Sequence, residues 1–192
     1  MQFIFKPTKL PEVMQIKPTV VPDNRGSFTK IFNTEEFLIN GINQTFVEDS
    51  VSVSKKNVLR GFHYQLAPHV EGKLVIVLKG KAFDVVVDIR RGAPNFGRWV
   101  SAILYGKNCD MLWVPPGFAH GFISMQNNTH VMYKMSAHYF SDKQRGIIWN
   151  DSKLGIKWPI TTPILSKRDS EFPTLDKAEL NFDLKSLSWH QS

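Results

Sequence analysis

The chain has 192 residues, of which 42% are hydrophobic and 21% charged, which is ordinary for a soluble globular protein and enough for one domain with a real core. Its formal net charge is +7, but the lysines and arginines are scattered singly or in pairs such as Lys55-Lys56. Because no basic run or basic amphipathic helix is present, the charge argues against a nucleic-acid or membrane partner and favours a phosphorylated small molecule.

The first predicted elements are a strand at Phe28–Phe32, a helix over "TEEFLING" and a strand at Thr45–Ser54. In the helix, Thr34 is the expected N-cap, two glutamates follow it, and Asn40-Gly41 is the expected stop. The next stretch, "RGFHYQ" at 60–65, is interpreted by itself as a polar turn entering a strand. The alternative is functional, because an arginine beside glycine suits an anion and a histidine in a cleft suits proton transfer.

The middle of the chain has mostly the periodicity of strands. "KLVIVLK" at 73–79 is a short apolar run, and "AFDVVVDI" at 82–89 places Phe83, Val85, Val87 and Ile89 on one alternating face. The linking "KGK" indicates a tight turn. Further strands are predicted at Arg98–Leu104, Met111–Val114, His120–Met125 and Val131–Tyr139, and a second helix at Pro173–Leu180.

Many short strands separated by Gly, Pro or Asn predict an all-β sandwich or barrel, and eight or more of them favour a jelly roll with few short helices. We expect one domain over residues 1–180 and a C-terminal tail at 181–192. The single cysteine, Cys109, cannot form an internal disulfide, and no apolar run suits a signal peptide or a membrane span. A cytoplasmic location is therefore expected.

Several kinds of site are excluded or disfavoured by the motifs. There is no glycine-rich phosphate loop and no Gly-x-Ser-x-Gly elbow. The six histidines are dispersed, without His-x-His or a His-Glu cluster on one strand, so neither a metal nor another cofactor is expected. Cys109 lies in a turn with no nearby signal of activation and is interpreted as an unreactive thiol.

Several longer motifs, in order, resemble one family. They are "RGFHYQ", "GKLVIVLKG", "FDVVVDIRRGAPNFG", "LWVPPGFAHGFISM", "YKMSAHYF", "GIIWNDSKLGIKWP" and "LSKRD". From about Pro22 to about Pro173 the sequence is similar to the dTDP-4-dehydrorhamnose 3,5-epimerases, nucleotide-sugar epimerases with a cupin jelly-roll barrel. The resemblance implies a metal-free enzyme, usually a homodimer, that inverts C3, C5 or both of a 4-keto-6-deoxy sugar linked to a nucleotide diphosphate.

Epimerisation next to a ketone needs two proton-transfer groups on opposite faces and a group that holds the enolate oxygen. The resemblance implies that His63 is the base and that Asp169 orients it. It implies that Tyr133 returns the proton and that Lys73 is the cation near the ketone. By position alone, Tyr133 would be a core aromatic residue and Lys73 a lysine at a strand end.

The resemblance also implies a set of residues that contact the ligand. Arg60 and Arg25 match ligand-contacting arginines, His120 matches a pocket histidine, and Tyr139 matches the aromatic residue that stacks on the nucleotide base. Gly61 would let the backbone run close to the ligand. The remaining positions of this binding shell depart from the family's common residues, and they are Lys30 (commonly Glu), Glu48 (Gln), Ser50 (Asn), Gln144 (Glu) and Arg168 (Lys).

These departures leave the exact ligand open, because unpaired polar groups reject mismatched substrates. One interpretation is a set of compensating changes around the usual dTDP-sugar. The other, slightly favoured by the charge reversal at Lys30, is a related enzyme for another nucleotide or sugar. A catalytically inactive sugar-binding cupin is the alternative from another class of protein, and the intact set of His63, Tyr133 and Asp169 argues against it.

Overall fold

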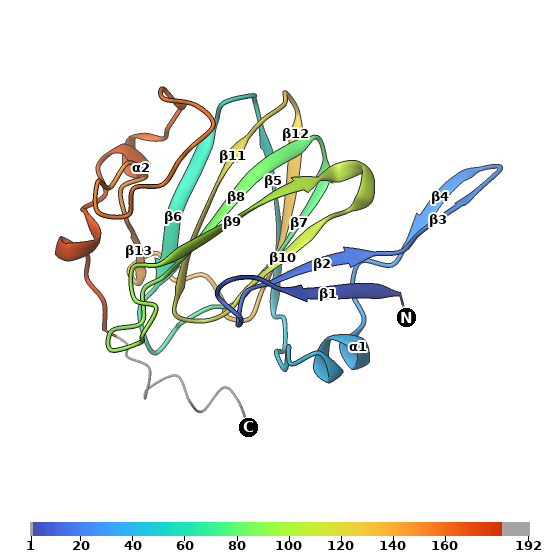
Figure 1. The fold of residues 1–192 in the computed structure, drawn as a ribbon, viewed down its shortest axis with the longest axis horizontal. Coiled ribbons are helices and arrows are strands. Elements are labelled where there is room, and N and C mark those ends of the chain that lie inside the picture. Colours follow the sequence, from blue (N-terminus) through green and yellow to red (C-terminus); the bar gives the residue numbers. More distant parts are fainter. Residues whose placement is uncertain (1, 182–192) are drawn as a thin grey trace.

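The computed structural model describes residues 2–181, and its body is formed by two antiparallel sheets that face each other (Figure 1). The six-stranded sheet has the order β1-β2-β10-β7-β12-β5, and the five-stranded sheet has the order β13-β6-β11-β8-β9. A separate hairpin, β3-β4, projects from this body. The predicted all-β jelly roll with few short helices is confirmed.

The strand and helix bounds are as follows. The six-stranded sheet contains β1 (Phe3–Pro7), β2 (Met14–Pro18), β5 (Glu48–Ser54), β7 (Lys73–Lys79), β10 (Met111–Val114) and β12 (Thr129–Met135). The five-stranded sheet contains β6 (Leu59–Gln65), β8 (Lys81–Asp88), β9 (Trp99–Tyr105), β11 (Phe118–Ser124) and β13 (Gln144–Gly146). The remaining elements are β3 (Val20–Asp23), β4 (Gly26–Thr29), α1 (Thr34–Ile39), α2 (Lys167–Ser170) and two 3-10 turns, Gly106–Asn108 and Leu175–Lys177.

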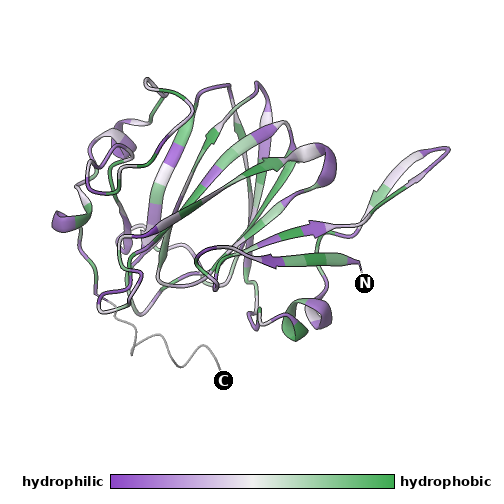
Figure 2. Ribbon diagram, in the orientation of Figure 1, coloured by the Kyte–Doolittle hydropathy of each residue, from purple (hydrophilic) through white to green (hydrophobic). Residues whose placement is uncertain are grey.

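The core has three layers because both sheets are covered on their outer faces. The central cluster lies between the sheets and contains Val75 and Val131 from one sheet and Val86 and Phe122 from the other. A second cluster lies under the C-terminal segments, and a third lies under α1 and the N-terminal strands. Hydrophobic residues accordingly run along the strands, and hydrophilic ones occupy most of the loops (Figure 2). This double cover explains why β8 is buried on both faces, although only one face was predicted to be apolar.

The interpretation of residues 60–65 as a turn was wrong, because these residues lie within β6. That strand pairs with β11 on one side and with β13 on the other. Phe62 and Tyr64 pack in the second cluster, while Arg60 and His63 are only partly buried. Gly61 has a φ of 121°, and a Cβ there would lie 2.6 Å from the Cα of Gly121. The glycine therefore lets β6 and β11 approach closely.

Two other predicted boundaries were wrong for local reasons. The N-cap of α1 is Asn33, whose side chain accepts a hydrogen bond from the Glu36 amide at 2.9 Å, and not Thr34. The predicted helix at 173–180 is only the 3-10 turn Leu175–Lys177, because the backbone is already extended at Ala178. The predicted tail, 181–192, lies outside the described residues except for Asn181. The side chain of Asn181 bonds to both the backbone N–H and the carbonyl of Ala67.

Candidate active site

The predicted base and its carboxylate are in contact. His63 comes from the middle of β6 and Asp169 from α2, and His63 Nε2 lies 2.9 Å from Asp169 Oδ1. The Asp169 side chain is 4% exposed, and its other oxygen accepts a hydrogen bond from the Gly61 amide at 3.4 Å. The Ser166 hydroxyl caps α2 by accepting a hydrogen bond from the Asp169 amide. Asp169 is thus held by both the strand and the helix cap.

The electrostatics keep this pair as a neutral imidazole and a carboxylate. Burial lowers the pKa of His63 below its ordinary value, and this effect outweighs the hydrogen bond and charge of Asp169, which act to raise it. Burial would raise the pKa of Asp169, but the hydrogen bond and charge of His63 hold it below its usual range. His63 is therefore unprotonated near neutral pH and can accept a proton.

The predicted acid lies on the opposite sheet. Tyr133 is on β12, and its ring contacts those of His120 and Phe122 on β11, with centroids 6.3 and 6.5 Å away. Its hydroxyl lies 3.1 Å from the Ser52 hydroxyl of β5. Burial raises the pKa of Tyr133 well above its ordinary value, and the hydrogen bond to Ser52 only partly offsets this. The phenol therefore stays protonated and can donate.

His120 lies beside His63, because the two residues are opposite each other in the register of β11 and β6. Its Nε2 is 2.9 Å from a carboxylate oxygen of Asp84 on β8, and both side chains are buried. Burial raises the pKa of Asp84, whereas the charge and hydrogen bond of His120 lower it. A second histidine–carboxylate pair therefore lies next to the pair of His63 and Asp169, on the inner face of the same sheet.

Lys73 begins β7, in the sheet that also carries Tyr133. Its ammonium is 2.7 Å from the Glu71 carboxylate, and the two side chains are only 11% and 5% exposed. Lys73 also acts electrostatically on His63 and lowers its pKa. An ammonium has three N–H donors, so one bond to Glu71 leaves two for a ligand oxygen.

Four residues of the predicted binding shell are joined by hydrogen bonds. The Glu48 carboxylate accepts a bond from the Tyr139 amide at 3.2 Å. The Gln144 side-chain oxygen accepts bonds from the Tyr139 hydroxyl at 3.0 Å and from the Arg168 guanidinium at 2.6 Å. Three of the positions that depart from the family pattern therefore bond to the same residue, Tyr139, or to one another.

The other binding residues are placed in different ways. Arg60 on β6 donates to the Ser54 hydroxyl at 3.1 Å, and Ser50 lies opposite Tyr133 in the register of β5 and β12. Lys30 follows β4 and is partly buried. Arg25 lies at the tip of the projecting hairpin β3-β4, where its 85% exposed side chain pairs with Asp23 at 2.6 Å (Figure 1). The fold thus separates Arg25 from the rest of the predicted site.

Three partners of the predicted site residues were missed by the sequence analysis, namely Ser52, Glu71 and Asp84. For Asp84 a signal was visible, since an acidic residue inside the apolar run "AFDVVVDI" must have a partner when it is buried. Ser52 alternates with Ser50 and Ser54, which indicates a polar inward face on β5. The position of Glu71 next to Gly72 and Lys73 carries no comparable signal.

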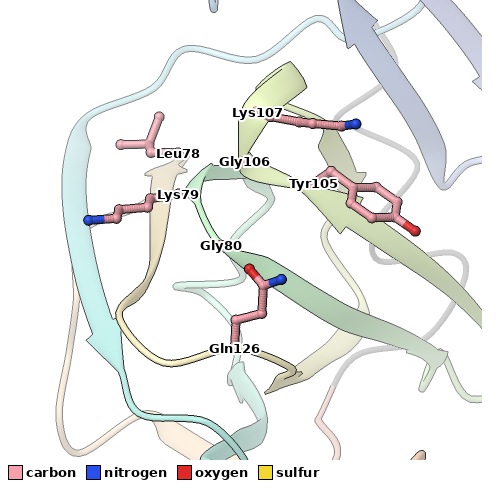
Figure 3. Close-up of a pocket in the computed structure, with 7 residues that line it drawn as sticks. All are labelled: Leu78, Lys79, Gly80, Tyr105, Gly106, Lys107 and Gln126. Carbon is pink, nitrogen blue, oxygen red and sulfur yellow. The ribbon is translucent and has the colours of Figure 1, made fainter.

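A surface hollow at the other end of β7 from Lys73 contains none of the predicted site residues. It is lined by the β7-β8 turn, by the end of β9 with the residues after it, and by one residue that follows β11 (Figure 3). The lining residues are Leu78, Lys79, Gly80, Tyr105, Gly106, Lys107 and Gln126. A second hollow, beside Trp99 and Lys6, also contains none of them. The chemistry of the predicted residues is therefore placed between the sheets and not in these hollows.

Two further observations concern residues 2–181. No group of three or more His, Cys, Asp or Glu side chains is arranged so that it could hold a metal ion. Within the same range, no helix has both the length and the apolar character needed to span a bilayer.

Comparisons with known proteins identify the family of this chain. Residues 7–177 match the family model described as dTDP-4-dehydrorhamnose 3,5-epimerase. The dTDP-4-dehydrorhamnose 3,5-epimerase of Salmonella typhimurium strain LT2 is 43% identical over 175 residues, which are 90% of this chain and 96% of that protein. These matches confirm the family that the sequence motifs indicated.

Solved structures show the same fold. A dTDP-6-deoxy-D-glucose-3,5-epimerase from Legionella pneumophila in complex with dTDP-4-keto-L-rhamnose has a TM-score of 0.87 at 38% identity, with 96% of this chain and 97% of that chain covered. A 3'-monoepimerase from Streptomyces bikiniensis in complex with dTDP has a TM-score of 0.90 at 28% identity, with 96% of each chain covered. The cupin-type barrel is thereby confirmed. The chain belongs to the dTDP-4-dehydrorhamnose 3,5-epimerase family of nucleotide-sugar isomerases.

Proposed function

We propose that the chain epimerises C3, C5 or both of a dTDP-linked 4-keto-6-deoxyhexose, with His63 as base and Tyr133 as acid. The observation that carries this proposal is the placement of a neutral imidazole and a neutral phenol on facing sheets. A sugar ring bound between the sheets presents one face to each group. This is the arrangement that inversion at a carbon next to a ketone requires.

The proton steps follow from the hydrogen bonds. Asp169 accepts the Nε2–H of His63, which leaves Nδ1 unprotonated to take the carbon-bound proton. The electrons of the broken C–H bond move into the ketone and form an enolate. The Tyr133 hydroxyl then gives its proton to the opposite face of the same carbon. Solvent restores the proton of Tyr133 and removes the one on His63.

The enolate needs more than a base. If the gap between the carbon acid and imidazole is roughly a dozen pKa units, it corresponds to about 16 kcal/mol. A positioned base contributes about 10²–10⁴-fold, so much of the remaining stabilisation must come from groups near the ketone oxygen. Lys73 is suited to this role because Glu71 fixes it in a buried position and leaves donors free.

A dTDP-linked substrate is supported by the relatives and not by the binding shell. Glu48, Gln144 and Arg168 bond to Tyr139 or to each other, but none of these bonds joins opposite charges, and Lys30 takes no part in them. The Salmonella relative is named for a dTDP-sugar, and both solved structures contain dTDP or a dTDP-sugar. Arg60 would contact the diphosphate and Tyr139 the base.

We also infer a homodimer in which Arg25 acts on the partner's site. Arg25 belongs to the predicted binding set, yet it lies at the tip of a hairpin that leaves the body of its own chain. The same hairpin exposes Val21 and Phe28, at 54% and 68%, which suits burial against a second copy. A two-fold dimer would bring each hairpin to the other subunit's site.

Complementation tests this dimer. Arg25→Ala and His63→Ala are each expected to be inactive alone. A mixed dimer has one intact site, so randomly remixed subunits should regain about a quarter of the wild-type activity. No recovery, with mixed dimers shown to be present, would place Arg25 in its own subunit's site, and an Arg25→Ala protein that is fully active alone would place it outside any site.

The proposed location is cytoplasmic, and residues 1–180 are proposed to act as one domain. The free Cys109 is consistent with a reducing compartment. Burial and the neighbouring Asp110 raise the pKa of its thiol, which makes it a poor nucleophile.

Solvent deuterium incorporation tests the activity itself. The protein should incorporate deuterium at C3, C5 or both of dTDP-4-keto-6-deoxyglucose in D₂O, because abstraction exchanges the carbon-bound proton. The positions labelled would show which carbons are deprotonated, and the configuration of the product would distinguish single from double epimerisation. Absence of exchange with dTDP-, GDP-, CDP- and UDP-linked 4-keto sugars would favour the alternative, an inactive cupin that only binds a nucleotide sugar.

A further inference from the structure

The last residue of the "RGFHYQ" stretch, Gln65, bonds to the backbone on both sides of Tyr139. Its side-chain Nε2 donates to the His138 carbonyl at 3.1 Å, and its Oε1 accepts from the Phe140 amide at 2.7 Å. These two groups belong to the two peptide units that flank Tyr139. One amide side chain therefore fixes the backbone of Tyr139 on both sides, much as a neighbouring strand would.

Gln65 is itself held firmly. It is 1% exposed, and its Nε2 also donates to the His69 carbonyl at 3.1 Å. It lies two residues after His63 on β6, where the ladder with β13 is regular from His63 to Gln65. Residues two apart on a strand point to the same face. Gln65 thus connects the strand of the catalytic base to the segment that carries Tyr139.

Few other contacts fix Tyr139. β12 ends at Met135, so the segment that follows has no strand partner of its own. Tyr139 is 47% exposed, its amide donates to Glu48 at 3.2 Å, and its hydroxyl donates to Gln144. The ring's position therefore depends on its backbone, and the backbone depends on Gln65. A stacked ring pair of Phe140 and His69, 3.8 Å apart, supports the same segment from the side.

We propose that Gln65 is a positioning residue, which sets the place of Tyr139 relative to His63 and thereby the place of the nucleotide base relative to the catalytic base. The inference rests on the proposed function in one respect, namely that Tyr139 stacks on the nucleotide. Gln65 touches neither substrate nor reacting atoms in this account. It acts through the Tyr139 backbone.

A double-mutant cycle with dTDP as the probe tests the coupling. In calorimetric titrations, Tyr139→Ala and Gln65→Met should each weaken dTDP binding by roughly 10-fold, since stacking on an aromatic ring and a buried hydrogen-bond set each have effects of this order. The double variant should be no weaker than Tyr139→Ala alone, because Gln65 has nothing left to position. The proposal would be overturned if the double variant lost affinity for dTDP by the product of the two single losses. If Tyr139→Ala has no effect, the stacking role in the proposed function fails instead.

Steady-state kinetics separate positioning from a merely structural role. A misplaced Tyr139 weakens ground state and transition state alike, so Gln65→Met should raise KM with kcat nearly unchanged. A loss of folded protein would lower kcat and leave KM as it was. Thr129→Val is the matched control: Thr129 is fully buried and its hydroxyl donates to the Gln126 carbonyl at 2.9 Å, and its replacement should change stability but not KM.

A measurement on the unaltered protein covers the case in which Gln65→Met does not fold. The Phe140 amide lies outside any strand, yet it donates to a buried acceptor. Its hydrogen exchange should be strongly protected, whereas the Tyr139 amide, which donates to the partly exposed Glu48, should exchange faster. Equal, rapid exchange of both amides would show that Gln65 does not hold the segment.

Discussion

Replacing Asp169 by Asn removes the charge that supports His63 while it preserves the size of the side chain. The contact it changes is the 2.9 Å bond between His63 Nε2 and Asp169 Oδ1, in which the carboxylate is 4% exposed. A hydrogen bond to a charged group contributes about 1.5–3 kcal/mol. At 1.36 kcal/mol for each factor of ten, kcat should fall by at least roughly 10- to 100-fold.

The pH dependence of the same variant has a definite sign. The hydrogen bond and charge of Asp169 both raise the pKa of His63, although burial keeps it below its ordinary value. Activity of the wild type should therefore fall only as the pH drops through this lowered pKa. Without the carboxylate the pKa of His63 falls further, so the acidic limb of kcat/KM should move to lower pH.

The assay is product formation from dTDP-4-keto-6-deoxyglucose across the pH range in which the protein stays folded. Asp176→Asn is the matched control, because it removes the same charge from an exposed ion pair with Lys153. This control should change neither kcat nor the pH at which kcat/KM falls on the acidic side. The role given to Asp169 would be refuted if the acidic limb of kcat/KM moved to higher pH in Asp169→Asn, or if kcat of this variant equalled that of wild type.

Three other outcomes are expected. Lys73→Met should lower kcat by roughly 10²–10³-fold, as loss of an enolate-stabilising donor does, and should also lower Tm because Glu71 is then buried without its partner; an unchanged kcat would remove Lys73 from the chemistry. Phe37→Ala, in the cluster under α1, should lower the free energy of unfolding in urea by about 3–5 kcal/mol without changing kcat of the folded protein. Activity should survive exhaustive dialysis against EDTA, and loss that a divalent ion reverses would contradict the proton-transfer mechanism.

The fold was predictable where hydrophobic pattern and turn residues agree. Met111–Val114 was predicted with its observed bounds, and the hairpin at 73–89 was predicted through its "KGK" turn. The N-terminal strands β1, β2 and β3 were missed. Each of these strands contains a proline, which is the last residue of β1 and of β2. In addition, β1 lies at the edge of its sheet, where fewer side chains are buried and the apolar pattern of an inner strand is weaker.

The predicted strand 131–139 shows the limit of local pattern. Its last four residues continue the alternation in sequence but lie beyond the end of β12, where the backbone on both sides of Tyr139 bonds to the Gln65 side chain. This partner lies more than 60 positions away in the sequence. No periodicity within the segment could indicate it.

The site was predicted by resemblance and not by spacing. His63 and Asp169 are separated by 106 positions, so only the tertiary structure brings them together. Asp84, the partner of His120, was not predicted because a carboxylate on a strand can face either side of a sheet until the register is known. Glu71, the partner of Lys73, precedes β7 and so belongs to no strand pattern. The separation of Arg25 from its own site also emerges only from the fold.

The central claim is that His63 and Tyr133 act on opposite faces of the sugar. The most direct test compares deuterium incorporation and inversion in folded Tyr133→Phe and His63→Ala variants, in D₂O with dTDP-4-keto-6-deoxyglucose. Tyr133→Phe should exchange the proton at one carbon, because His63 can return it to the face it left, while most inverted product is lost. His63→Ala should lose both by at least about 10²–10⁴-fold. A folded Tyr133→Phe protein that inverts the sugar as fast as wild type would contradict the account.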